Sequence, residues 1–126
     1  RYLLKYYWQS QLSLSLPRLR PAAGVTDVPH IADRQYVRYW LALRLFLPDA
    51  GFALSSRESA AFRDHMMQIC ITQVSGGART EPGGYSGLEA TEQFSRDDTR
   101  SVAEMARAIE AIGKEPVFTD WAPLLK

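Results

Sequence analysis

The chain has 126 residues, of which 46% are hydrophobic and 23% are charged, and its formal net charge at pH 7 is +1. This length and composition allow one buried core and disfavour the classes of disordered and membrane-spanning proteins. The balance of 15 basic and 14 acidic side chains gives no electrostatic footprint for nucleic acid or for an anionic membrane surface.

The sequence contains one cysteine, Cys70, and does not begin with Met. A single cysteine cannot form an internal disulfide, so we expect a reducing, cytoplasmic environment. No signal-peptide pattern follows Arg1. A missing initiator Met is what a piece of a longer protein would show, and we expect the chain to be such a piece.

The first half of the chain predicts the end of a helix, a strand and a longer helix. Residues 1–10 have helical spacing, and residues 12–16 alternate leucine with serine as a half-buried strand does. Pro17 ends this strand because proline cannot donate a hydrogen bond to a sheet. Asp33 is expected to cap a helix that continues to about Leu47. The predicted apolar stripe of this helix contains Val37, Leu41 and Leu45, widened by Tyr36, Trp40 and Leu43.

The middle of the chain predicts two further strands, over residues 51–55 and 71–75, with a helix between them. Ser59 is expected to cap this helix. Its predicted inward face consists of Phe62, Met66, Ile69 and Cys70. A loop over residues 76–100 follows, and connections of this length are usually functional or disordered.

A capping box formed by Ser101 and Glu104 predicts the start of a last helix, which Gly113 ends. Its predicted inward face consists of Val102, Met105, Ile109 and Ile112. In the tail, Phe118 and Trp121 are large enough to need a docking surface.

Three consecutive strand–helix units predict an α/β protein with a parallel sheet. A sheet of three parallel strands has two unpaired edges and needs helices on its faces. We therefore expect residues 1–126 to form a single partial domain, three parallel strand–helix units that are part of a closed TIM-type barrel. In such folds the residues just past the carboxyl ends of the strands converge on the ligand-binding face.

Polar residues follow the second and the third predicted strand. Ser55 and Arg57 come after one strand, and Ser75 and Gly76 come after the next. A guanidinium group there could hold a carboxylate through two parallel hydrogen bonds, and a serine hydroxyl could donate a third. An ion pair of Arg57 with Glu58, and a plain serine turn, are the structural alternatives.

Arg18 and Arg20 follow the first strand, where both could meet an anionic group. Alternatively, one of them bridges neighbouring loops while the other is solvated. The glycine pairs at 76–77 and 83–84 could bind phosphate through backbone N–H groups, although no nucleotide-binding motif is present. We predict no metal site, because the spacing of the candidate ligands is unsuitable. These candidates are His30, His65 and Cys70.

Six stretches together resemble the carboxyl-terminal part of the radical S-adenosylmethionine tyrosine lyases, in particular the branch that serves thiamine biosynthesis. They are YYWQS, SLPRLRPAAG, SSRESAAFRD, VSGGARTEPGGY, LEATEQFSRDDTRS and GKEPVFTDW. Their order and spacing match those of the family. From about residue 24 to residue 126 the chain also resembles the biotin and thiamin synthesis-associated domain.

The resemblance implies a (β/α)8 barrel of which this chain supplies strands six to eight. It implies cleavage of the Cα–Cβ bond of L-tyrosine to 2-iminoacetate and p-cresol, initiated by a 5′-deoxyadenosyl radical. S-adenosyl-L-methionine and a 4Fe-4S cluster held by a CxxxCxxC motif are implied for the complete enzyme. This chain lacks the motif, so it is expected to be inactive alone and to need the amino-terminal half of the barrel. Thiazole synthase is a further implied partner.

The resemblance also implies roles for individual residues. Arg57 and Ser75 match the positions that hold the substrate carboxylate, and Ser55 and Gly76 are expected beside them. Arg18 and Arg20 are expected to bind S-adenosylmethionine.

The chain departs from the family pattern at three positions. Ser56 replaces a threonine and keeps the hydroxyl, Ala78 replaces a serine, and Phe118 replaces a tryptophan. Two alternative functions remain. One is the related hydrogenase-maturation tyrosine lyase, which carries a cysteine-rich carboxyl-terminal extension. These 126 residues contain no such extension, which favours the thiamine branch unless truncation has removed it. The other is a non-catalytic anion-binding half-barrel.

Overall fold

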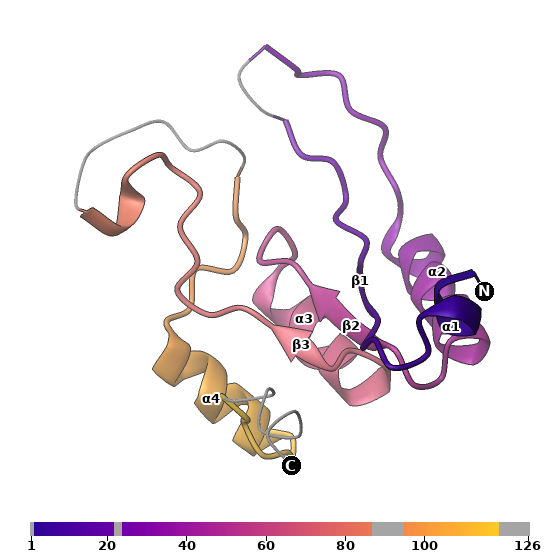
Figure 1. Ribbon diagram of the computed structural model, residues 1–126. Coiled ribbons are helices and arrows are strands. Elements are labelled where there is room, and N and C mark those ends of the chain that lie inside the picture. Colours follow the sequence, from indigo (N-terminus) through magenta and orange to yellow (C-terminus); the bar gives the residue numbers. More distant parts are fainter. Residues whose placement is uncertain (1, 22–23, 87–94, 119–126) are drawn as a thin grey trace.

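The structure is a computed structural model, which describes residues 2–21, 24–86 and 95–118 (Figure 1). In chain order its elements are α1 (Tyr2–Tyr6), β1 (Ser13–Ser15), α2 (Asp33–Phe46), β2 (Gly51–Leu54), α3 (Ala60–Ile69), β3 (Gln73–Val74), the 3-10 helix η1 (Gly84–Ser86) and α4 (Val102–Ala111). Within these ranges no helix has the length and hydropathy that crossing a membrane requires.

The three strands form one parallel sheet in the order β1-β2-β3, which confirms the predicted fold class. Ser13 pairs with Gly51, and Ala53 pairs with Gln73. Since spatial order follows chain order, each connection moves the chain one strand further, as in a (β/α) barrel. The described parts of the connections after β1 and β3 run away from the sheet (Figure 1).

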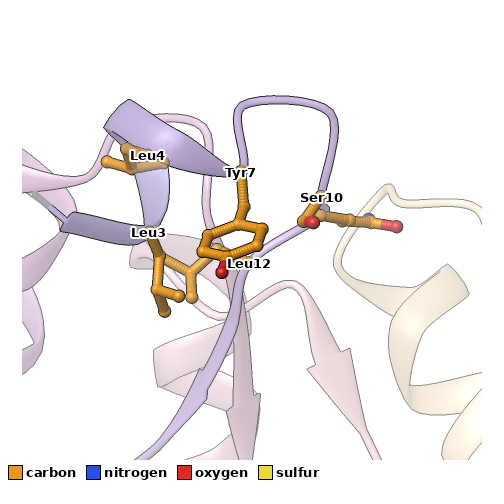
Figure 2. A pocket seen from close by; sticks show the side chains of 6 residues that line it. Leu3, Leu4, Tyr7, Ser10 and Leu12 are labelled. Atoms are coloured by element: carbon orange, nitrogen blue, oxygen red, sulfur yellow. The ribbon is translucent and has the colours of Figure 1, made fainter.

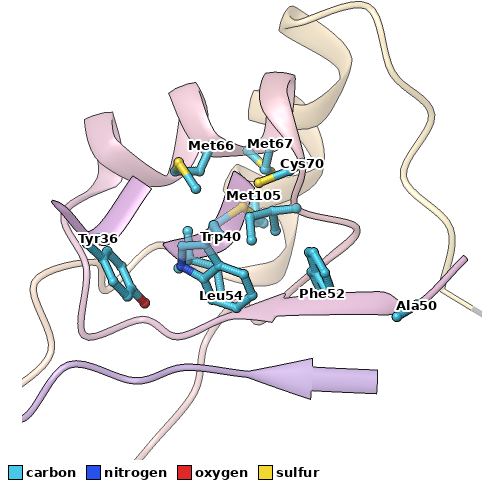
Figure 3. Packing of buried hydrophobic residues seen from close by; sticks show 10 residues of the cluster. Tyr36, Trp40, Ala50, Phe52, Leu54, Met66, Met67, Cys70 and Met105 are labelled. Atoms are coloured by element: carbon cyan, nitrogen blue, oxygen red, sulfur yellow. The ribbon is translucent and has the colours of Figure 1, made fainter. Parts of the chain in front are cut away.

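The core lies on one face of the sheet, between the strands and the helices (Figure 3). Trp40 of α2 and Phe52 of β2 are fully buried, with ring centroids 5.4 Å apart. The other buried apolar side chains are Tyr36, Ala50, Leu54, Met66, Met67, Cys70, Ile71 and Met105. This core is the apolar layer that a parallel sheet needs between itself and its helices.

The predicted face of α2 is partly confirmed, and its predicted cap is wrong. Tyr36 and Trp40 are buried, and Val37 and Leu43 pack against the core, whereas Leu41 is 39% and Leu45 86% exposed. Two large aromatic rings bury more apolar surface than leucines do, so they set the rotation of the helix. The N-cap position is Ala32, without a side-chain hydrogen bond, and Asp33 is the first helical residue.

The other predicted helix ends are confirmed. The Ser59 side chain accepts a hydrogen bond from the Phe62 N–H at the start of α3. Ser101 and Glu104 form both bonds of a capping box. The predicted face of α3 is wrong at Ile69, which is 53% exposed, because the helix turns Met67 toward the core instead.

At the carboxyl end, Phe118 is 71% exposed, so the described residues supply no docking surface for it. Trp121 lies outside the described residues.

Candidate functional site

The sheet face opposite the core carries small and polar side chains. The pairing register places on this face Ser13, Ser15, Gly51, Ala53 and Gln73. The Ser13 hydroxyl donates to Gln73 Oε1 across β2, at 2.7 Å. A Cβ at Gly51 would lie 3.4 Å from Ser13 Oγ and 3.5 Å from Gln73 Nε2, so both side chains lie directly over this residue. This face therefore offers hydrogen-bonding groups where a purely structural barrel would place branched apolar side chains.

Three of the predicted site residues lie at the carboxyl edge of this face. Ser55 and Arg57 follow β2, and Ser75 follows β3. The Ser55 hydroxyl accepts a hydrogen bond from the Arg57 N–H at 3.2 Å. The Arg57 guanidinium group is half-buried, and its Nη1 donates to the Arg18 carbonyl at 3.2 Å. The parallel sheet thus brings these residues to one edge, as predicted from their positions after the strands.

Arg18 has a structural role in this arrangement. Its Nε donates to both oxygens of the fully buried Glu58, at 3.1 Å each. Its Nη1 donates to the Ile31 carbonyl at 2.9 Å and to Asp33 at 2.6 Å. The guanidinium group also lies over the Tyr36 ring, 4.6 Å from its centroid. All three nitrogens are engaged, since Nη2 donates to Glu58 as well.

The Arg20 side chain makes fewer hydrogen bonds than that of Arg18. Its Nη2 donates to the Arg57 carbonyl and, at 2.7 Å, to the Asp97 carboxylate. Its Nε is buried and has no hydrogen-bond partner within the described part of the chain. Of the two arginines predicted to meet an anion, Arg20 is therefore the one with an available donor.

Gly76 makes a close backbone contact. A Cβ at this position would lie 2.9 Å from Val102 Cα, at the start of α4. Real Cβ atoms essentially never approach other atoms so closely, so only glycine fits. This packing explains the glycine without a ligand, and the predicted ligand contact stays a prediction.

A buried charge cluster beside the edge escaped the sequence analysis. Arg63 of α3 donates to Asp98 at 2.5 Å, and their side chains are 1% and 0% exposed. Arg100 donates to the same carboxylate and to Asp64. The two acidic residues between the arginines of RDDTR, residues 96–100, were the available signal, but the partner Arg63 lies 35 residues before Asp98.

Two hollows of the described surface have linings that do not include Arg57. One, of about 230 Å³, lies between α1 and β1 and is lined mainly by Leu3, Leu4, Tyr7 and Leu12 (Figure 2). A wider open groove runs between β3 and α4 and includes Gly76. The described residues contain no group of three potential metal ligands. Cys70 is buried, which raises the pKa of its thiol, so it does not fit an iron–sulfur cluster.

Comparison with known families gives one match over most of the chain. The model of the biotin and thiamin synthesis associated domain matches residues 15–115. Two curated relatives are 2-iminoacetate synthases. The chain is 42% identical to the one from Salmonella typhimurium over 122 residues and 43% identical to the one from Escherichia coli over 122 residues. In both cases the match covers 95% of this chain and 32% of the relative, so the chain spans about a third of their length.

Two solved structures of the FeFe-hydrogenase maturase HydG have the same fold. The protein from Carboxydothermus hydrogenoformans is 33% identical, with a TM-score of 0.78, over 93% of this chain and 27% of that chain. A second HydG structure is 30% identical, with a TM-score of 0.84, over 94% of this chain and 26% of that chain.

Proposed function

Because the chain belongs to the biotin and thiamin synthesis associated domain family, we propose that it is the substrate-side part of a radical S-adenosylmethionine tyrosine lyase. The proposed reaction cleaves the Cα–Cβ bond of L-tyrosine to 2-iminoacetate and p-cresol, for the thiazole of thiamine. The observation that carries this proposal is the identity of 42% and 43% to two 2-iminoacetate synthases over 95% of the chain.

In this function Arg57 binds the carboxylate of tyrosine through its planar guanidinium group. Ser75 and Ser55 donate hydroxyl hydrogen bonds beside it, and Gly76 offers its backbone. The position of Arg57, Ser55 and Ser75 at one edge of a polar sheet face supports these roles. Holding the carboxylate fixes the amino group of the substrate for hydrogen abstraction.

The cofactors belong to the complete enzyme. S-adenosylmethionine and the cluster, when bound, supply the 5′-deoxyadenosyl radical that abstracts hydrogen from the amino group. With Cys70 as the one cysteine of the chain, the cluster ligands must come from elsewhere. Arg20, whose Nε is buried without a described partner, is the better candidate for contact with S-adenosylmethionine, and Arg18 is the weaker one.

A second candidate function is that of a hydrogenase-maturation tyrosine lyase. The fold similarity to HydG favours it, with TM-scores of 0.78 and 0.84. The sequence identity of 33% and 30% is lower than that to the 2-iminoacetate synthases. A contact with thiazole synthase and a cytoplasmic location remain predictions.

The decisive experiment uses the complete protein that carries this chain. It is reconstituted with iron and sulfide without oxygen and supplied with S-adenosylmethionine, a reductant and L-tyrosine. We expect p-cresol and 2-iminoacetate, and we expect the gene to restore growth without thiamine to a strain that lacks 2-iminoacetate synthase. Failure to form p-cresol would refute the proposal. Activation of an immature FeFe-hydrogenase, without rescue of thiamine synthesis, would favour the second function.

A further inference from the structure

Residues 97–100, here called the crossing segment, contact the loops that follow all three strands. The Asp97 carboxylate accepts from Arg20, which follows β1. The N–H groups of Asp97 and Asp98 both donate to the Ser56 carbonyl, after β2, at 3.1 Å. The Gly77 N–H, after β3, donates to the Arg100 carbonyl at 2.8 Å. Figure 1 shows this part of the chain, just before α4, beside the segment after β3.

Asp98 lies at the centre of these contacts. Its N–H donates a hydrogen bond to the carbonyl of Ser56, the residue directly before Arg57. Its carboxylate binds Arg63 Nη1 at 2.5 Å, and Arg63 Nη2 donates to the Ser75 carbonyl at 2.6 Å. One continuous series of hydrogen bonds therefore joins the backbone beside Arg57 to the backbone of Ser75.

The burial of this series makes it rigid. The Asp98 side chain is 0% exposed and the Arg63 side chain 1%, so water does not compete for their hydrogen bonds. A buried ion pair is weak evidence for stability, because desolvation offsets the attraction of the charges. The geometry of the Asp98–Arg63 pair, in contrast, is narrowly defined, because the planar guanidinium group fixes the direction of each of its hydrogen bonds.

We propose that Asp98 and Arg63 are positioning residues, which set the distance between Arg57 and Ser75 and so shape the site for the substrate carboxylate. This inference rests on the proposed function for the identity of the ligand. The two residues need not touch the ligand, because they act through the backbone of the residues that do.

The test compares Asp98→Asn with Asp64→Asn in the complete enzyme. Asparagine at 98 keeps one acceptor oxygen but turns an NH2 donor toward Arg63 or Arg100. Asp64 accepts from the same Arg100, at 2.9 Å, and within the described part of the chain its carboxylate accepts no hydrogen bond from the Arg63 side chain, so its variant is a control for the loss of a carboxylate. Arg63→Lys is a second variant, for the case that Asp98→Asn does not fold. It keeps the positive charge but loses the planar guanidinium group that binds Asp98 and Ser75 at once.

We expect Asp98→Asn to lower kcat/KM for tyrosine about 10- to 100-fold, mainly through KM, and to raise the ratio of 5′-deoxyadenosine to p-cresol. Asp64→Asn should stay within about twofold of wild type. If Asp98 acts through Arg57, then Arg57→Lys should cost much less in the Asp98→Asn background than in wild type. A merely structural role would leave the two effects additive.

The proposal is overturned if Asp98→Asn matches wild type in KM and coupling, or if its effect and that of Arg57→Lys are additive. If the wild-type protein neither binds nor cleaves tyrosine, the proposed function fails instead. Crystal structures of wild type and Asp98→Asn then decide the positioning role: an unchanged separation of the Ser56 and Ser75 carbonyls would overturn it, and a changed one would support it.

Discussion

Three arginines at the carboxyl edge of the sheet differ in what their side chains hold. All three guanidinium nitrogens of Arg18 donate hydrogen bonds, to Glu58, to Asp33 and to the Ile31 carbonyl. Arg20 holds the Arg57 carbonyl, while the Ser55 hydroxyl holds the Arg57 N–H. The backbone of Arg57 is thus fixed on both sides, which is the preorganisation that a ligand-binding side chain needs.

The first prediction concerns this side chain. Arg57→Lys in the complete enzyme keeps the positive charge and loses the planar fork. Loss of a charge-assisted bidentate pair should cost about 2–4 kcal/mol, or roughly 30- to 1000-fold in kcat/KM for tyrosine. Steady-state kinetics should also show more 5′-deoxyadenosine per p-cresol, because the amino group is no longer held near the radical carbon.

The control for this prediction is Arg38→Lys, at an exposed position of α2. Normal turnover and coupling of Arg57→Lys would make Arg57 a structural residue.

The second prediction concerns acid stability and Asp98. Burial alone would raise the pKa of Asp98, but the hydrogen bonds from Arg100 and the charge of Arg63 outweigh it and hold the pKa below the ordinary value. A lowered pKa in the folded state stabilises the protein above the unfolded pKa of about 4, and this contribution is lost as the pH falls through the folded pKa. Thermal melting below about pH 4 should therefore show a steeper fall of Tm for wild type than for Asp98→Asn. The exposed Asp27→Asn should keep the wild-type slope; equal slopes for all three proteins would contradict the prediction.

At the scale of the elements, Arg44 joins three of them at the end of the sheet opposite the candidate site. Its Nη1 donates to the carbonyls of Pro48 and Ala50, at 2.8 and 2.9 Å, before β2. Its Nη2 donates to the Cys70 carbonyl at the end of α3, at 2.8 Å. The guanidinium group lies 4.1 Å from the centroid of the Phe52 ring. In barrels this amino-terminal end of the strands serves stability, and the carboxyl end serves catalysis.

The third prediction follows from that division. Arg44→Leu removes the guanidinium group and leaves three carbonyls without their donor. We expect a loss of about 2–4 kcal/mol in the free energy of unfolding, measured by urea denaturation. Arg38→Leu on the same helix should stay within about 0.5 kcal/mol of wild type. The tyrosine KM of Arg44→Leu should be unchanged well below its Tm, and a raised KM would contradict the separation of the two ends.

The elements also show how far the sequence predicts the fold and the site. The signals that were right are local: the leucine–serine alternation of residues 12–16 and the caps at Ser59 and Ser101 depend on neighbours in the chain. The face of α2 depends on a distant strand, and leucine spacing alone could not show that Trp40 would face Phe52.

For the site, parallel strands make the positions after strand ends predictable, so the sequence predicted the place of Arg57 and Ser75. The partners of Arg18 and Arg63 could not be predicted in the same way. Glu58 and Asp98 lie 40 and 35 residues further along the chain, and many acidic residues would have fitted equally well.

At the scale of the whole molecule, the described chain forms one parallel sheet that helices cover on one face only. The two edges of this sheet are open. Helices cover the face that carries Phe52 and Leu54, while the face with Ser13 and Gln73 has no helix packed on it among the described elements. Within the same residues β1 and β3 each pair with a strand on one side only. A closed barrel would satisfy both edges and enclose the polar face.

The fourth prediction tests the chain by itself. After reconstitution with iron and sulfide, the 126-residue chain should form no p-cresol from L-tyrosine and S-adenosylmethionine. The physical reason is the number of ligands, because one buried thiol, Cys70, cannot replace the several thiolates that hold an iron–sulfur cluster. The complete protein, treated identically, is the positive control, and p-cresol is measured by chromatography. The same preparation should also lack the visible absorption of a bound cluster, so the cause of inactivity is observed directly. Any p-cresol above the protein-free control would show that the chain holds a competent radical source, and it would contradict the assignment of this chain to the substrate side alone.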